Sequence, residues 1–405
     1  MTTDAVSADA AHRIGPRRLL TLLGGRATFR LLLYVSAGVL VAAWSREDFT
    51  VYAAAVGAAG WLAMLVQSGP EKAALTLIPR ARRTREQLIG PLRAIVAYVP
   101  PPFAAAGAVA FALAPDSAVT VYLLAIAYYI SLGCGMLGVA LHRALGGYGR
   151  DTVHFSLLGL GMIGMAGLAF TAGIGPAGYL VGLVALMTVL NIALLRGLPR
   201  GSGARPRRAV RRLLAGTVAL MGAADVMANA IVGTLFVELA LTSHAGQSGD
   251  LYLMILGWGF ATSVVYTVQR IYQPRLALRM VSPDAPEARA LARRIAGLAV
   301  WGSALWLVLA GVALAGGLAG TRSLVALGVL MATLLPANAL AGFGIFVLEN
   351  AGGTGLRGSA RAVVLAWAVV AALGALVIPL AGAAGAVYAL GAQGLVLGLA
   401  LRRRI

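Results

Sequence analysis

Charged side chains are scarce in this sequence: Asp, Glu, Lys and Arg together make up 12% of its 405 residues. Soluble domains carry about 25% charged residues and about half apolar ones. Here the hydrophobic residues reach 60%, and the mean hydropathy is +0.86. At about 20 residues per membrane crossing, the chain has room for about twelve spans with short loops. No length remains for a folded soluble domain, so we expect an all-α polytopic membrane protein.

Cysteine, lysine and histidine are also rare. Cys134 is the only cysteine, which excludes an internal disulfide and a cysteine metal cluster. Lys72, the only lysine, has no Gly-x-x-x-x-Gly-Lys-Ser/Thr context, so the chain lacks the Walker A site of an ATP-driven pump. The histidines do not have metal-ligand spacing. We therefore expect neither a metal nor a cofactor, and transport would need an ion gradient or the gradient of the substrate itself.

Long apolar runs separated by short polar breaks predict the membrane-spanning helices. The polar residues 1–18 precede the first run, and no small-residue cleavage site follows a short apolar core. We expect these residues to form a cytoplasmic tail rather than a cleaved signal peptide. The predicted spans cover residues 19–44, 49–69, 92–113, 118–141, 153–172, 177–195, 213–241, 251–271, 295–318, 324–348, 363–380 and 383–401.

The basic residues are unevenly distributed along a chain whose formal net charge is +19. If both termini are cytoplasmic, every Lys and Arg except Arg46 and Arg322 lies in or next to a cytoplasmic segment. Such segments are where Lys and Arg concentrate in membrane proteins. We therefore expect an even number of spans and both termini inside a bacterial-type cytoplasmic membrane. The arginine clusters then set the topology and favour anionic lipid headgroups, which excludes nucleic acid as a partner.

The two halves of the sequence repeat the same features. The segment LHRALGGYGR at 141–150 follows the fourth predicted span, and the similar LENAGGTGLR at 348–357 follows the tenth. Glycine-rich turns come next, at 175–178 and at 382–385. Two halves with the same in-out sense indicate parallel repeats, an architecture of transporters that rock two lobes around a central site. The predicted six-helix lobes are residues 19–200 and 201–405.

Three segments resemble one family of membrane exporters. They are SREDFTVY at 45–52, GPEKAALTLIPR at 69–80 and VIPLAGAAGAVY at 377–388, and Asp225 in the seventh span lies where many members have an acidic residue. The chain is thereby similar to the polysaccharide-export and lipid-linked oligosaccharide flippases of the multidrug/oligosaccharidyl-lipid/polysaccharide (MOP) exporter superfamily. The resemblance implies two V-shaped lobes, spans 1, 2, 7 and 8 lining a cavity, and movement of a polyprenyl-linked sugar by alternating access.

Polar and ionisable side chains inside the spans are the candidate functional residues, because ionisable groups are costly in a membrane and mark pathways or pairs. Span 1 carries Arg26 and Arg30 on one helix face, and span 7 carries Asp225, Asn229 and Glu238. Aligning the Arg-Arg-Leu-Leu segments that precede both spans places Arg30 opposite Ala224, one residue from Asp225, so Arg30 and Asp225 should lie at similar depth across the cavity. We expect a switchable pair in which the arginines, with Asn229, bind a pyrophosphate or an acidic sugar. Asp225 would hold the arginines in the empty state or, like Glu238, take part in coupling and gating.

Each of these residues also has a purely structural interpretation. Arg26 and Arg30 could extend to headgroups from an interfacial turn, and Asp225 could belong to a static pair. Arg270, near the inner end of span 8, is either a further substrate ligand or a boundary arginine. The remaining polar residues are expected to be interhelical hydrogen-bond partners or helix-end charges, namely Asn191, Asn338, Gln393, Glu71, Lys72 and Glu349.

Three classes of function fit these observations. We favour a monomeric flippase or exporter of a lipid-linked oligosaccharide or polysaccharide precursor, with glycosyltransferases or a polymerase of the same pathway as expected partners. The alternative is an ion-coupled small-molecule exporter, either a multidrug exporter of the same superfamily or a major-facilitator protein. Residues 78–85 lack the Gly-x-x-x-Asp-Arg-x-Gly-Arg signature of the latter. A membrane enzyme is the third class, and Glu47 and Asp48 are its only paired external carboxylates, but the external connections are too short for that class.

Overall fold

The computed structural model describes residues 16–79, 81, 84–147, 149–199, 207–262, 285–318, 323–350 and 353–402. Within these ranges all regular secondary structure is helical. Nine of the described helices are long and apolar enough to cross a membrane. The prediction of an all-α polytopic protein is therefore confirmed, whereas the number of crossings and the side on which the termini lie stay predictions.

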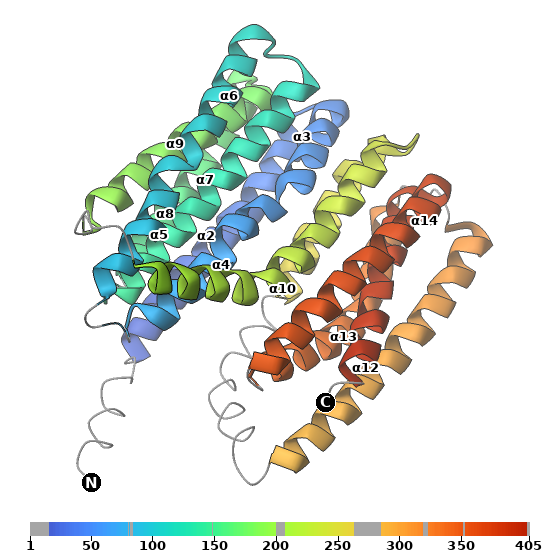
Figure 1. Cartoon of the computed structure of the whole chain (residues 1–405). Helices are drawn as coiled ribbons and strands as arrows, with labels where there is room; N and C mark the ends of the chain where they lie inside the picture. Colours follow the sequence, from blue (N-terminus) through green and yellow to red (C-terminus); the bar gives the residue numbers. More distant parts are fainter. Residues whose placement is uncertain are drawn as a thin grey trace.

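The first half of the chain forms one bundle of helices (Figure 1). Two of its long segments are interrupted. The break between α3 and α4 falls at Gly60, and the break between α5 and α6 falls directly before Pro100, which lacks an amide hydrogen for the preceding turn. The helices are α2 (Pro16–Ala43), α3 (Arg46–Ala59), α4 (Trp61–Leu77), α5 (Arg85–Tyr98), α6 (Pro100–Leu113), α7 (Ala118–Ala144), α8 (Gly149–Ala172) and α9 (Pro176–Arg196).

The acidic residues expected in the first external loop belong to a helix instead. Ser45 is the N-cap of α3, and its hydroxyl accepts a hydrogen bond from the Asp48 amide at 3.1 Å. Glu47 and Asp48 therefore lie in the first turn, where negative charge stabilises the free amide groups. This role accounts for the pair of carboxylates without any catalytic chemistry.

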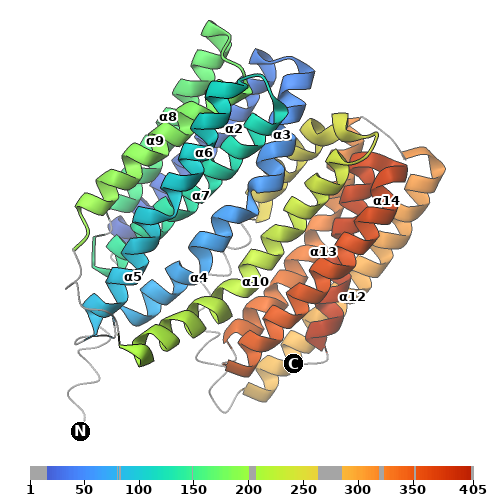
Figure 2. The same cartoon turned by 45° about the horizontal axis from the view of Figure 1, so that its top comes forward.

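The second half of the chain forms a second bundle beside the first (Figures 1 and 2). Between α10 and α12, a further helical stretch is described over residues 248–262. The labelled elements are α10 (Arg208–Ala240), the 3-10 turn η1 (Ala245–Gln247), α12 (Ala285–Ala313), the π-helical turn η2 (Leu314–Leu318), α13 (Leu324–Asn350) and α14 (Gly353–Arg402).

The element α14 is too long for a single crossing. Its 50 residues would extend about 75 Å as one straight helix, against a hydrocarbon thickness of about 30 Å. The helix breaks at Gly382, whose φ of 59° and ψ of −134° are not helical and suit a residue without a Cβ. The break coincides with the predicted boundary between the last two spans, so α14 consists of two legs.

Both bundles use their turns at the end opposite to the chain termini in the same way. In the first, the Trp44 indole donates a hydrogen bond to the carbonyl oxygen of Ile174 at 2.8 Å, which ties the turn after α2 to the turn between α8 and α9. In the second, the Gln247 side chain accepts a hydrogen bond from the Ala383 amide at 2.8 Å, which ties the turn after α10 to the turn inside α14. These equivalent contacts agree with the repeat in the sequence.

The two bundles meet where α10 packs against α4 and α3. A Cβ on Gly222 would lie 2.9 Å from the Cα of Gly69, and the Ser68 hydroxyl donates to the carbonyl oxygen of Gly222 at 3.3 Å. Small residues let the two backbones approach this closely, as at other membrane helix crossings. Figure 2 shows α4 and α10 side by side between the rest of the two bundles.

Candidate functional site

An ion pair joins the two bundles beside this helix crossing. The Lys72 ammonium on α4 lies 2.9 Å from a carboxylate oxygen of Asp225 on α10. The two side chains are 36% and 37% exposed, so other groups can reach both of them. Pairing is expected of charges in membrane-spanning helices, because either charge alone would be costly there. The structure thus brings together Asp225, a predicted site residue, and Lys72, which was expected at a helix end.

The assignment of Glu71 and Lys72 to a helix end is wrong. The apolar run that defined the second span stops at residue 69, but α4 continues through Pro70 to Leu77. Ala73 and Ala74 are fully buried and hold this last part of α4 against the first bundle. Both charged residues therefore lie inside the helix, and consecutive residues point about 100° apart around its axis.

The Glu71 side chain points into the first bundle, whereas the Lys72 side chain points toward the second. The Glu71 carboxylate accepts hydrogen bonds from the Arg143 guanidinium of α7 and, at 2.5 Å, from the Gln67 amide. Arg143 also lies 3.5 Å from Asp151 of α8, whose side chain is 2% exposed. Buried charges need such partners. This network ties α4, α7 and α8 together, so the helix that carries Lys72 is firmly attached to its own bundle.

The predicted pair between Arg30 and Asp225 is not the one that forms, because Asp225 pairs with Lys72. The helix α2 packs mainly against α8, with the rings of Phe29 and Phe155 5.4 Å apart. The structure therefore places α4, not α2, beside Asp225 on α10. The alignment of spans 1 and 7 indicates that Arg30 and Asp225 lie at similar depth in the membrane. It carries no information about which helices are neighbours.

Arg30 is nevertheless exposed near the boundary between the bundles. Tyr34 lies one turn farther along the same face of α2. Its ring contacts that of Phe260 in the second bundle, with the centroids 5.7 Å apart. Arg30 thus stands on the face of α2 that turns to the second bundle, and the arrangement leaves its guanidinium accessible.

The other two predicted residues of α10 have different surroundings. The Asn229 side-chain amide donates to the carbonyl oxygen of Asp225 at 2.9 Å, so it is bonded to its own helix. Glu238 lies against α14, where a Cβ on Gly374 would overlap its carboxylate. Within the described part of the chain, one buried oxygen of Glu238 has no hydrogen-bond partner. Buried polar atoms without a partner are uncommon in folded proteins, so this oxygen marks Glu238 as a candidate binding position.

Two predicted residues cannot be placed in the site. Arg26 lies in α2, but its side chain is outside the described residues, as is the whole of Arg270. Asn191 is an interhelical partner, as predicted, because its amide donates to the carbonyl oxygen of Ser131 on α7 at 2.9 Å.

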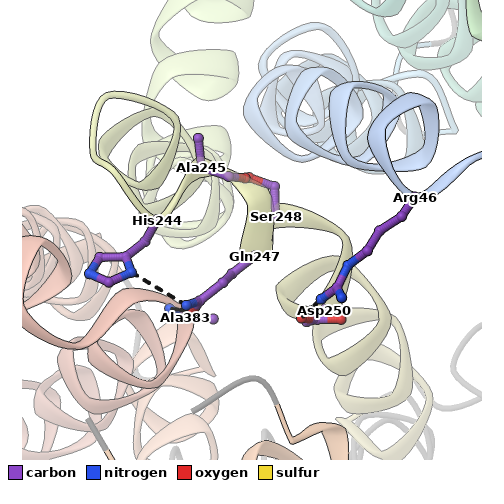
Figure 3. A network of polar contacts seen from close by, with 7 residues as sticks. All are labelled: Arg46, His244, Ala245, Gln247, Ser248, Asp250 and Ala383. Atoms are coloured by element: carbon purple, nitrogen blue, oxygen red, sulfur yellow. Dashed lines mark hydrogen bonds and ion pairs between the residues drawn. The ribbon is translucent and has the colours of Figure 1, made fainter. Parts of the chain in front are cut away.

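A second ion pair between the bundles lies at the end opposite to the chain termini. Arg46 at the start of α3 is 3.4 Å from Asp250, at the start of the helical stretch that follows η1 (Figure 3). Arg46 is 67% exposed, so this pair is accessible to solvent. In the same view Gln247 reaches His244 and Ala383, and it thereby anchors η1 to α14.

Aromatic side chains pack beneath the ion pair of Arg46 and Asp250, which we name the outer pair. The Tyr252 ring of the second bundle lies 6.0 Å from Tyr52 and 6.2 Å from Phe49, both on α3. The Tyr52 ring in turn lies 5.7 Å from Tyr179 on α9. All four rings are buried. Edge contacts of this kind add to the apolar burial, so the bundles are closed against each other at this end.

No family model and no curated protein matches this sequence. Among solved structures, the fold is similar to an inward-facing multidrug resistance MATE family transporter of the MOP superfamily. The TM-score is 0.56 at 12% identity, over 91% of this chain and 92% of that one. It is also similar to a MOP superfamily transporter from Pyrococcus furiosus, described as having a binding pocket of reverse polarity. There the TM-score is 0.52 at 9% identity, over 95% and 92% of the chains. The chain therefore has the fold of MOP superfamily transporters.

Proposed function

We propose that this protein is a membrane exporter that works by alternating access of its two bundles. The fold supports this proposal, since the similar structures are transporters. Two ion pairs across the boundary also support it. Arg46 and Asp250 form one at the outer end, and Lys72 and Asp225 form the other nearer the termini. Opening the boundary on either side would break one of these pairs, and closing it would re-form that pair.

The proposed cargo is a lipid-linked oligosaccharide or polysaccharide precursor. The observation that carries this proposal is the accessible pair of Lys72 and Asp225 at the helix crossing. A pyrophosphate that enters the boundary would compete with the Asp225 carboxylate for the Lys72 ammonium through charge-assisted hydrogen bonds. Arg30, exposed on the face of α2 that turns to the second bundle, would bind the same headgroup. Arg26, Asn229 and Arg270 remain further proposed ligands.

Coupling is proposed for the two acidic residues of α10. Asp225, once displaced from Lys72, would bind the coupling cation, so that binding of the anion and binding of the cation are linked. Glu238 would take up a second cation through its buried, unpartnered carboxylate oxygen. The protein would act in a bacterial-type cytoplasmic membrane, as a monomer, beside glycosyltransferases or a polymerase that make or use the cargo.

An ion-coupled multidrug exporter is the second candidate, because the structure with a TM-score of 0.56 is a multidrug resistance transporter. The two candidates differ in what Lys72 should do. An ammonium group at the boundary attracts an anionic headgroup but repels a small cationic cargo. Charge selectivity at this position therefore separates the two functions.

A reconstitution experiment tests the proposed cargo. Proteoliposomes with a fluorescent polyprenyl-pyrophosphate oligosaccharide are compared with empty vesicles, and the measurement is the rate at which the headgroup reaches an impermeant reagent. We expect the wild-type protein to accelerate this exposure. Lys72→Gln should remove most of the acceleration, whereas Lys72→Arg should keep part of it, because the cation is retained.

Glu86→Gln is the matched control, since Glu86 is an exposed carboxyl residue in the first turn of α5. It should transport like the wild-type protein. Absence of acceleration with several lipid carriers, together with ion-dependent efflux of small cationic dyes, would contradict the glycolipid proposal and support the multidrug exporter.

A further inference from the structure

The helix α10 is longer than its membrane crossing requires. Its 33 residues extend about 50 Å, and a tilt of about 40°, the upper end of the usual range, would leave about 38 Å along the membrane normal. The hydrocarbon core is about 30 Å thick. One end of α10 must therefore lie outside the core, and the basic residues near Arg208 show which end that is.

The first turns of α10 have two different faces. Leu214 is 8% exposed and packs into a cluster of the first bundle together with Leu198. The outward face carries exposed arginines and Leu213, which is 56% exposed. A helical face that combines arginines with an exposed leucine is typical of segments that lie in the headgroup region of a bilayer. Figure 1 shows this part of α10 running across the base of the first bundle before the helix turns upward.

A second segment brings further positive charge to the same place. The backbone amide of Arg207 donates to the side chain of Gln87 on α5 at 3.3 Å, and α5 begins with the exposed Arg85. The first turn of α10 contains no acidic residue. We name the exposed arginines Arg85, Arg207, Arg208, Arg211 and Arg212 the basic surface.

We propose that the basic surface is a docking site for the headgroups of anionic phospholipids. The guanidinium groups would hold the lipid phosphates, and Leu213 would enter the boundary between headgroups and acyl chains. A soluble anion such as inorganic phosphate would satisfy the arginines but leave Leu213 in water, so the exposed leucine favours a lipid. This inference does not depend on the cargo, because the basic surface is separate from Lys72 and Asp225.

A fluorescence experiment tests the lipid site. Leu213→Cys is made in a Cys134→Ala background, which gives a single thiol for a bimane label because Cys134 is the only cysteine. The protein is reconstituted in phosphatidylcholine vesicles that contain equal amounts of brominated phosphatidylglycerol or brominated phosphatidylcholine. We expect stronger quenching by the brominated phosphatidylglycerol. The preference should fall as NaCl is raised from about 0.05 to about 1 M, because salt screens exposed charges.

Two double variants complete the test. Arg211→Gln with Arg212→Gln should reduce the preference for phosphatidylglycerol by roughly fivefold per arginine. Arg357→Gln with Arg361→Gln, which removes two exposed arginines from the second bundle, should leave it unchanged. Equal quenching by both brominated lipids, or quenching by aqueous iodide alone, would overturn the proposal, as would displacement of the lipid preference by inorganic phosphate at constant ionic strength.

Discussion

The ammonium nitrogen of Lys72 lies 2.9 Å from a carboxylate oxygen of Asp225, and this contact joins the two bundles. It stands beside the crossing of α4 and α10 at Gly69 and Gly222. Lys72 is also the only lysine of the chain. The pair is accessible, and its two residues lie on the helices that connect the bundles. Binding of a charged cargo to this pair can therefore affect the movement of one bundle against the other.

Transport should depend on the charges of Lys72 and Asp225 rather than on the sizes of their side chains. Asp225→Asn keeps the shape of the side chain but leaves Lys72 without its counter-ion, so we expect at least a tenfold loss of transport at normal expression. Exchanging the two residues, Lys72→Asp with Asp225→Lys, should restore part of the activity in a double-mutant cycle. Additive losses in the cycle would show that the two residues act independently and would remove the pair from the mechanism.

Amine labelling can report directly on the state of this pair. Lys72 carries the only side-chain amine, so mass spectrometry of its peptide after treatment with an amine-reactive reagent measures one site. Asp225→Asn should increase labelling, because the ammonium is no longer held by the carboxylate. A pyrophosphate-linked lipid should decrease labelling of the wild-type protein. Labelling that does not respond to the lipid would contradict a role of Lys72 in binding its headgroup.

The helix crossing should not tolerate a larger residue. A Cβ on Gly222 would meet the backbone at Gly69, so we expect Gly222→Ala to cost about 1 to 3 kcal/mol in the free energy of unfolding and to slow transport. Gly216→Ala is the matched control on the same helix, where a Cβ would meet no atom within 4 Å. Thermal unfolding in detergent checks both variants, and equal melting temperatures would contradict the close packing of the two helices.

The buried charge network should contribute more to stability than the outer pair. Arg143→Ala leaves the part-buried carboxylate of Glu71 and the buried carboxylate of Asp151 without their guanidinium, and we expect a loss of about 3 kcal/mol in the free energy of unfolding. Arg46→Ala breaks an ion pair whose arginine is 67% exposed, and should cost less than about 1 kcal/mol. Denaturant unfolding of both variants measures the difference. The opposite order would show that the network around Arg143 is not a stabilising element.

Movement at the outer end can be tested with a cross-link. Arg46→Cys and Asp250→Cys, made together with Cys134→Ala, place two thiols where the outer pair lies. A short bifunctional thiol reagent should join them and stop transport, because outward opening requires the two positions to separate. In either single-cysteine variant, the reagent should leave the transport rate unchanged. Full activity of the cross-linked protein would rule out alternating access through this boundary.

The fold was largely predictable from the sequence. Apolar runs located the helices because each crossing must be apolar and must satisfy its own backbone hydrogen bonds. The glycine-rich turn at 382–385 was placed correctly because a helix of this length cannot continue across the membrane, and Gly382 adopts the required backbone angles. The uneven distribution of arginine predicted the topology, which stays a prediction.

The site was predicted only in part. Asp225 was singled out because a lone acid inside an apolar helix needs an explanation. Its partner was not found, since hydropathy ends the second span at residue 69 while the helix continues to Leu77. A signal was present in the adjacent opposite charges of Glu71 and Lys72, which must point in different directions from one helix. Nothing in the sequence showed that Arg143 would form an ion pair with Glu71.

What the sequence determined by itself is the membrane class, the approximate helix positions and the twofold repeat, because these depend on local hydropathy and on periodicity along the chain. Which helices become neighbours was decided only by tertiary packing. Asp225 could have faced Arg30 or Lys72 at similar depth, and the outcome depends on the close fit of α10 against α4 at glycines far apart in the sequence. Steric complementarity between helices, rather than hydrophobicity, therefore determines that Asp225 pairs with Lys72.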